Sequence, residues 1–130
     1  MPHSRTELFA AHLRARLAAL PSHGWVTAPT AITPLPDVAA RLGATWIGIK
    51  RDDQLATMGG SSKIRKLDFL LAQPRYLQAA AWQSAGAIGS GHLLALAQAA
   101  RACGKRLHVH LFDEPRSPGI VENLAATVSL

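Results

Sequence analysis

The stretch AAAWQSAGAIGSGHLLALAQAARACGKRLHVHLF, residues 79–112, decides the fold of this chain. It opens with an apolar run over 79–84 and then passes through a glycine-rich turn over 85–91. A helical pattern follows and ends at Gly104, after which a second apolar run covers 106–112. Strand, glycine turn, helix and strand in this order predict a βαβ unit of a parallel sheet.

Further elements are predicted on both sides of this unit. A Ser4–Glu7 capping box begins a first helix, and Ser117-Pro118 begins the last one. Between them we expect a short helix over 38–42, a strand over 46–50 and a helix over 63–72.

These elements predict an α/β fold, organised as an N-terminal helix with a proline-rich lead-in (1–45) and a partial α/β region (46–130). A parallel sheet usually needs more strands than these. The chain ends after a helix, where another strand would begin, so we expect the fold to be incomplete at its C-terminus.

Composition limits the class of protein. The chain has 130 residues, 48% of them apolar, which favours a packed core over disorder. The net charge is +6, but the basic residues are scattered and aromatic residues make up only 5%, which argues against nucleic-acid binding. Cys103 is the only cysteine, so no disulfide forms within the chain. Without a membrane-length apolar run or a secretory signal, the sequence favours the cytoplasm.

The segment GGSSKIRKL, residues 59–67, places Lys63 at the start of a predicted helix. A helix N-terminus carries partial positive charge, which disfavours an ammonium ion and would favour the neutral amine that attacks an aldehyde. The alternative is a solvated lysine in a basic turn, because Arg65 and Lys66 are close by.

The glycine turn SAGAIGSGH, residues 84–92, joins the predicted strand to the next helix. Its glycine order differs from the dinucleotide pattern G-x-G-x-x-G and it has no Walker lysine, which argues against a nucleotide-binding domain. Successive backbone amides at a helix start would hold a carboxylate or a phosphate. The alternatives are a tight turn that binds nothing and, for His92, a solvent-exposed helix residue.

Several blocks together resemble a known family. IKRDD at 49–53, the glycine pair and KIRKLDFLL at 63–71 are similar to the signature of the D-cysteine desulfhydrase and ACC deaminase family, I-K-R-D-D followed by G-G-N-K-x-R-K-L-E-x-L-L. Thr33-Pro34-Leu35 matches its lead-in, and the turn over 85–92 resembles A-G-x-x-Q-S-N-H. The chain departs from the pattern with two serines before Lys63, and with glycines where the family has glutamine and asparagine in the turn.

The resemblance implies a tryptophan synthase β-like fold and a pyridoxal 5'-phosphate (PLP) cofactor. It implies that Lys63 holds PLP covalently and is catalytic, and that Gly91 and His92 also contact the cofactor. The substrate carboxylate would be received by Gly89, Ser90, Gly91 and His92. The implied reaction is that of a lyase or deaminase, which releases ammonia and a keto acid from a small amino acid.

The same resemblance sets expectations for partners. A small amino acid is the expected substrate, and the expected protein partner is a second copy of the chain or a missing C-terminal half. No metal, nucleic acid or membrane is expected. Because the family's phosphate-binding loop lies in its C-terminal half, we expect these 130 residues alone to be inactive. The alternative is a truncated or non-catalytic relative that acts as a binding or interaction protein.

Overall fold

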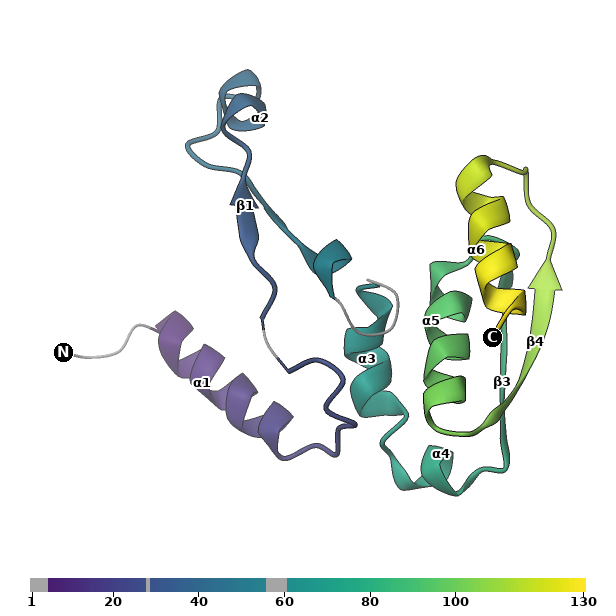
Figure 1. Cartoon of the computed structure of the whole chain (residues 1–130). Coiled ribbons are helices and arrows are strands. Elements are labelled where there is room, and N and C mark those ends of the chain that lie inside the picture. The colour runs from purple at the N-terminus through teal and green to yellow at the C-terminus, as the bar shows by residue number, and fades with distance from the viewer. Residues whose placement is uncertain (1–4, 28, 56–60) are drawn as a thin grey trace.

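The computed structural model describes residues 5–27, 29–55 and 61–130. Helices and short strands alternate along the chain (Figure 1). The elements are α1 (Arg5–Ala18), β1 (Ile32–Pro34), α2 (Pro36–Arg41), β2 (Gly48–Lys50), the 3-10 turn η1 (Asp52–Gln54), α3 (Lys63–Leu70), α4 (Pro74–Gln78), β3 (Ala81–Ala87), α5 (Gly91–Ala102), β4 (Arg106–Phe112) and α6 (Pro118–Val128).

The predicted βαβ unit is confirmed. β3 and β4 pair in parallel, from Ala81 opposite Arg106 to Ala87 opposite Phe112, and α5 makes the crossover between them. The last helix also begins as predicted, because Ser117 is its N-cap and Pro118 its first residue. α5 packs on both strands, and α6 lies beside α5 (Figure 1).

The expectation of parallel strands does not extend to β2. β2 pairs antiparallel with β1, with Ile32 opposite Lys50 and Pro34 opposite Gly48. The proline-rich lead-in therefore contains a strand that its sequence did not reveal. An apolar run predicts a strand but carries no information on its partner. Here the chain turns back through α2, and the β1–β2 hairpin projects from the rest of the molecule (Figure 1).

The core lies where α3 and β3 both pack on α5. Ile64, Leu67 and Leu71 recur at helical spacing and are buried, with exposed fractions of 0 to 2%. α5 meets them with small residues and one leucine that allow the two helices to approach closely. The buried cluster comprises Leu55, Ile64, Leu67, Leu71, Trp82, Ala95, Leu96, Ala99 and Ala100. This packing brings the N-termini of α3 and α5 to the same end of the molecule (Figure 1).

α4 was not predicted, because five residues are too few to show a helical period. Side-chain hydrogen bonds from Trp82 and Lys105 fix it to the core. Trp82 Nε1 donates to the carbonyl of Tyr76 at 3.0 Å. Lys105 Nζ donates to the carbonyls of Leu77, in the helix, and Ala79, directly after it, at 2.7 and 2.9 Å.

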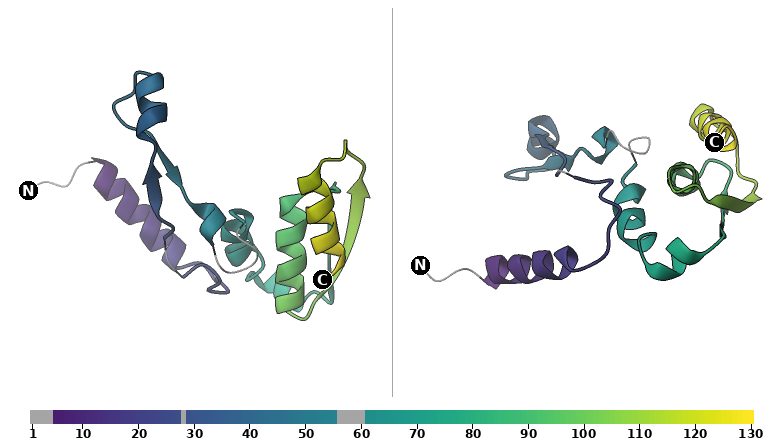
Figure 2. Two further views of the ribbon diagram at one scale, coloured as in Figure 1. Left: turned by 45° about the horizontal axis from the view of Figure 1, so that its top comes forward. Right: turned by 60° about the horizontal axis from the view of Figure 1, so that its bottom comes forward.

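α1 has no buried residue, although its apolar side chains recur at helical spacing as predicted. The right-hand view of Figure 2 shows α1 extending away from the other helices. Of the helices in the described ranges, none combines the length and the apolar character required to cross a lipid bilayer.

Candidate functional site

The N-termini of α3 and α5 form the framework of the candidate site. α3 begins at Lys63, as predicted, and α5 begins at Gly91 directly after Ser90. The two helices pack along their length through the buried cluster, so their first turns are neighbours (Figure 1). Two helix N-termini side by side concentrate positive partial charge.

Lys63 is exposed at this end of the molecule. Its Nζ donates a hydrogen bond of 3.3 Å to the hydroxyl of Ser62, and its backbone amide donates to the hydroxyl of Ser61 at 3.3 Å. Both serines of the unusual loop therefore contact Lys63. The glycine pair at 59–60 lies outside the described residues.

The turn before α5 leaves two backbone amides available. Ser90 caps the helix, because its hydroxyl accepts a hydrogen bond of 3.4 Å from the amide of Leu93. Among the described residues, the amides of Gly91 and His92 have no acceptor. A β-carbon added at Gly91 would meet no atom within 4 Å. The first turn of α5 therefore offers two amide donors beside open space, the arrangement that binds an anionic oxygen.

Gly89 differs from the other predicted substrate-binding residues. Its amide donates to Oε1 of Glu114 at 2.6 Å, and its carbonyl accepts from Nδ2 of Asn123 at 2.9 Å. A β-carbon at Gly89 would lie 2.6 Å from Cγ1 of Ile120. Both peptide groups of Gly89 are thus engaged by the segment after β4 and by α6.

The sequence analysis did not identify Glu114 or Asn123 as part of this site. The position of Glu114 in the sequence could have indicated a site residue, because Glu114 follows closely after β4. The carboxyl ends of parallel strands are where α/β proteins place site residues. Asn123 carried no comparable signal, because a single polar residue on an apolar helix is common.

His92 is the second residue of α5. Its Nδ1 is buried and has no hydrogen-bond partner among the described residues. Burial lowers the pKa of His92 below its usual 6.5, and the positive charges of Lys66 and Lys63 lower it further. The imidazole is therefore neutral at pH 7, and Lys63 lies within electrostatic range of the turn.

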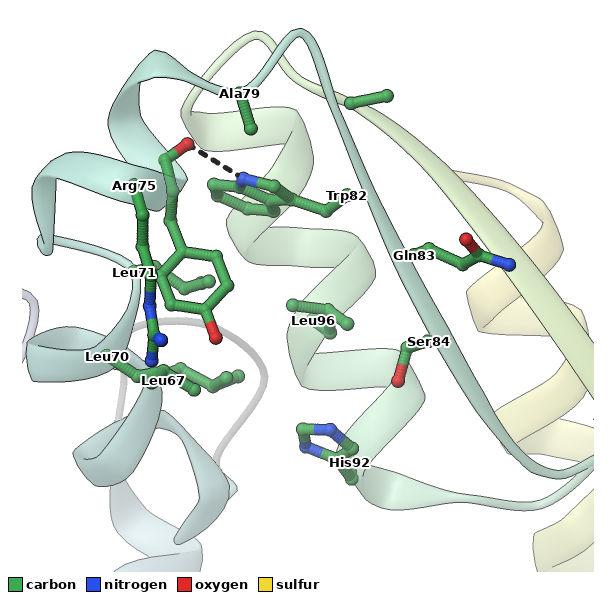
Figure 3. A pocket seen from close by; sticks show the side chains of 12 residues that line it. Leu67, Leu70, Leu71, Arg75, Ala79, Trp82, Gln83, Ser84, His92 and Leu96 are labelled. Carbon is green, nitrogen blue, oxygen red and sulfur yellow. Dashed lines mark hydrogen bonds between the residues drawn. The ribbon is translucent and has the colours of Figure 1, made fainter.

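A cavity of about 350 Å³ adjoins His92 (Figure 3). It lies between the α3–α4 segment and the β3–α5 unit, and apolar side chains line most of it. The ring of Tyr76 and the guanidinium of Arg75 border it, with Arg75 Cζ 4.7 Å from the ring centre. Cavities of this size bind small molecules in many proteins.

A second cavity, of about 540 Å³, connects the two predicted stretches. Ser61 and Ser62 line it on the α3 side and Gly91 on the α5 side, and Asn123 of α6 also borders it. The end of the β1–β2 hairpin closes another side with residues 49–53. The structure therefore brings the IKRDD block, the lysine loop and the glycine turn around one space.

The described residues show neither a metal centre nor an activated cysteine. Within the described ranges, no three His, Cys, Asp or Glu side chains gather to hold a metal ion. Cys103 lies at the end of α5, and burial raises the pKa of its thiol. A thiol with a raised pKa is a poor nucleophile at neutral pH.

The chain is similar in sequence to an epimerase and to D-cysteine desulfhydrases. No family-level sequence model matches the chain. The nocardicin C-9' epimerase of Nocardia uniformis is 34% identical over 103 residues, which cover 79% of this chain and 30% of that protein. The D-cysteine desulfhydrase of Klebsiella pneumoniae is 39% identical over 95 residues, and that of Salmonella typhimurium 38% over 100. The chain spans about 30% of the length of these relatives.

The fold has a counterpart among solved structures. The crystal structure of an ACC deaminase homologue superposes with a TM-score of 0.66 over 86% of this chain and 40% of that one. The sequences are 24% identical in this comparison, so the likeness concerns the fold.

Proposed function

Because the chain belongs to the D-cysteine desulfhydrase and ACC deaminase family, we propose that it forms part of a PLP-dependent enzyme that acts on a small amino acid. The reaction would be an elimination or a deamination that releases ammonia and a keto acid. One observation carries the proposal: Lys63 and the available amides of Gly91 and His92 lie at adjacent helix N-termini.

The residues present fit such a cofactor. PLP carries an aldehyde, which an amine binds covalently. Lys63 supplies an exposed amine. Gly91 supplies unfilled space, and His92 supplies a buried ring nitrogen without a partner among the described residues. Lys63, Gly91 and His92 are therefore the residues that would hold the group.

When bound, PLP supplies an electron sink that stabilises negative charge at the substrate α-carbon. The Lys63 amine would hold the cofactor between turnovers and move the proton at that carbon. The amides of Gly91 and His92 would bind the substrate carboxylate and orient the amino acid. Glu114 and Asn123 would keep the turn in place while the substrate binds.

Epimerisation is a second candidate, favoured by the match to the nocardicin epimerase. Elimination and epimerisation both start with removal of the α-proton. An epimerase then returns a proton to the opposite face, which requires a second proton carrier. His92, neutral at pH 7 and in electrostatic range of Lys63, is a residue of that kind.

The proposal is tested by trapping the cofactor. The chain is incubated with PLP and reduced with borohydride, and the modified lysines are then quantified by peptide mass spectrometry. We expect modification of Lys63 above that of Lys66 and Lys105, and its loss in Lys63→Ala. Equal modification of all lysines would favour a non-catalytic binding protein.

Turnover is measured separately. We expect no hydrogen sulfide from D-cysteine with these 130 residues alone, because the resemblance assigns the phosphate-binding loop to a part of the family that they do not cover. In a protein that includes that part, sulfide release identifies the eliminase. Deuterium incorporation at the α-carbon without sulfide identifies the epimerase.

A further inference from the structure

Asp52 connects the β1–β2 hairpin to the helix that carries Lys63. Arg65, two residues after Lys63, donates two hydrogen bonds to the Asp52 carboxylate. Arg65 Nη2 donates to Oδ1 at 2.8 Å, and Arg65 Nε donates to Oδ2 at 3.0 Å. A bidentate pair of this kind fixes the direction of both side chains as well as the distance between them.

Two further side chains complete the cluster. The hydroxyl of Thr30 donates to Oδ1 of Asp52 at 2.6 Å, and Arg65 Nη2 also donates to that hydroxyl oxygen at 3.1 Å. Lys50 Nζ donates to the same carboxylate oxygen at 3.0 Å and contacts Thr30 Oγ1. The hydrogen bonds from Arg65, Thr30 and Lys50 hold the pKa of Asp52 far below its ordinary value. The carboxylate is therefore charged at neutral pH.

The first turn of α3 is held by the buried side chain of Ile64 and by Arg65. The helix has eight residues, and its N-cap Ser62 makes no side-chain capping bond. Short helices fray at their ends unless tertiary contacts hold them. Residues 63 and 65 lie within one turn, so a fixed Arg65 side chain also fixes the rotation of the backbone from which Lys63 projects.

We propose that Asp52 is a positioning residue for Lys63, acting through its bidentate hydrogen bonds to Arg65. The role assigned to Lys63 rests on the function proposed above. The Asp52 cluster orients the first turn of α3, and Ser61 and Ser62 directly before that turn border the cavity shared with Gly91. A charged, well-anchored carboxylate at the end of the hairpin thus sets the geometry of a reactive amine on another element.

The chain provides a matched control in the next residue. Asp53 is also a carboxylate but pairs with Arg51, at 2.7 Å, and not with α3. Its side chain is 60% exposed, against 21% for Asp52. Asp53→Asn therefore removes the same charge from the same turn while leaving the contacts of Arg65 intact.

The experiment compares the 130-residue wild type with Asp52→Asn, Asp53→Asn and Arg65→Lys. Each protein is treated with PLP and borohydride, and modification of Lys63 is divided by that of Lys105, a distant lysine. Hydrogen exchange of the α3 amides is measured without PLP. We expect Asp52→Asn to lower the ratio about fivefold and to speed exchange in the first turn of α3. Asp53→Asn should change neither.

Arg65→Lys separates orientation from charge. Lysine keeps the positive charge but not the planar fork that makes the bidentate contact. We expect it to lower the modification ratio as Asp52→Asn does. Should it behave as wild type, the cluster acts only as a charge balance and the proposal is wrong. Because Arg65→Lys is the milder change, it also serves as the test if Asp52→Asn does not fold.

The two proposals fail in different ways. If wild-type Lys63 is modified no more than Lys105, the proposed function fails. If wild-type Lys63 is modified selectively and Asp52→Asn changes neither the ratio nor the exchange, the positioning role fails while the proposed function stands.

Discussion

The Glu114 carboxylate accepts a hydrogen bond of 2.6 Å from the backbone amide of Gly89. The loop after β4 therefore holds the turn that opens α5. Asn123 holds the carbonyl side of Gly89 from α6, at 2.9 Å. Since these bonds engage both peptide groups of Gly89, the amides that remain available in the described turn are those of Gly91 and His92. The four predicted substrate-binding residues therefore have different roles. Gly89 is held by Glu114 and Asn123, Ser90 caps α5, and Gly91 and His92 offer amide donors.

This brace predicts a difference between two substitutions of Glu114. Glutamine keeps a side-chain oxygen that accepts from Gly89, whereas alanine removes the acceptor. We expect Glu114→Ala to speed hydrogen exchange of the Gly89 amide by about tenfold, the equivalent of one lost hydrogen bond. Glu114→Gln should exchange within a factor of about two of wild type. NMR measures the exchange rate of this amide. Equal rates in the two variants would show that the carboxylate does not hold the turn.

Gly89 and Gly91 should respond differently to alanine. A β-carbon at Gly89 would lie 2.6 Å from Ile120 Cγ1 and 2.9 Å from Glu114 Oε1, while one at Gly91 would meet nothing within 4 Å. We expect Gly89→Ala to lower the free energy of unfolding by about 1–3 kcal/mol through overpacking. Gly91→Ala should change it by less than about 0.5 kcal/mol. Urea denaturation measures both, and similar losses would contradict the packing around Gly89.

Asp68 is the buried polar residue of α3, with 2% of its surface exposed. Its Oδ1 accepts from the hydroxyl of Ser22 at 3.1 Å and from the amide of Trp25 at 3.2 Å, which ties the lead-in to α3. We expect Asp68→Ala to cost about 2–4 kcal/mol, because it removes these bonds and leaves a cavity.

The control for this contact is Asp68→Asn, which keeps an acceptor oxygen of similar size and should cost less than half as much. Urea denaturation of the two variants is the measurement. A loss as large in Asp68→Asn as in Asp68→Ala would mean that the negative charge matters rather than the acceptor.

His92 makes the stability of the folded protein decrease as the pH falls. Its pKa in the folded protein is lowered below 6.5, mainly by burial, so folding favours the neutral ring. This contribution to stability is present above the unfolded pKa of about 6.5 and is lost as pH falls through the lower folded value. We expect the Tm to fall on acidification from about pH 7 to 5, and to fall less in His92→Gln.

His108→Gln is the control for this pH dependence, because His108 is exposed on β4. It should keep the wild-type pH dependence of the Tm. If His92→Gln and the wild type lose stability in parallel over this range, another group titrates.

Features confined to a few neighbouring residues were predictable from the sequence. The period of the apolar side chains gave the βαβ unit, and the bounds of β4 match those expected. Ser117-Pro118 marked the start of α6, and the residues before Lys63 marked the start of α3. Each of these signals depends on residues within one or two turns of the chain, where backbone preference and side-chain spacing act directly.

The contacts that assemble the site depended on the tertiary structure. Three sets of contacts join parts of the chain that are distant in sequence. β2 pairs with β1, Arg65 binds the carboxylate of Asp52, and Glu114 and Asn123 bind Gly89. The residues alone determined that Lys63 and the glycine turn would each begin a helix. Only the packing of α3 on α5 determined that these two beginnings share a cavity, because contacts between distant segments depend on how the whole core closes.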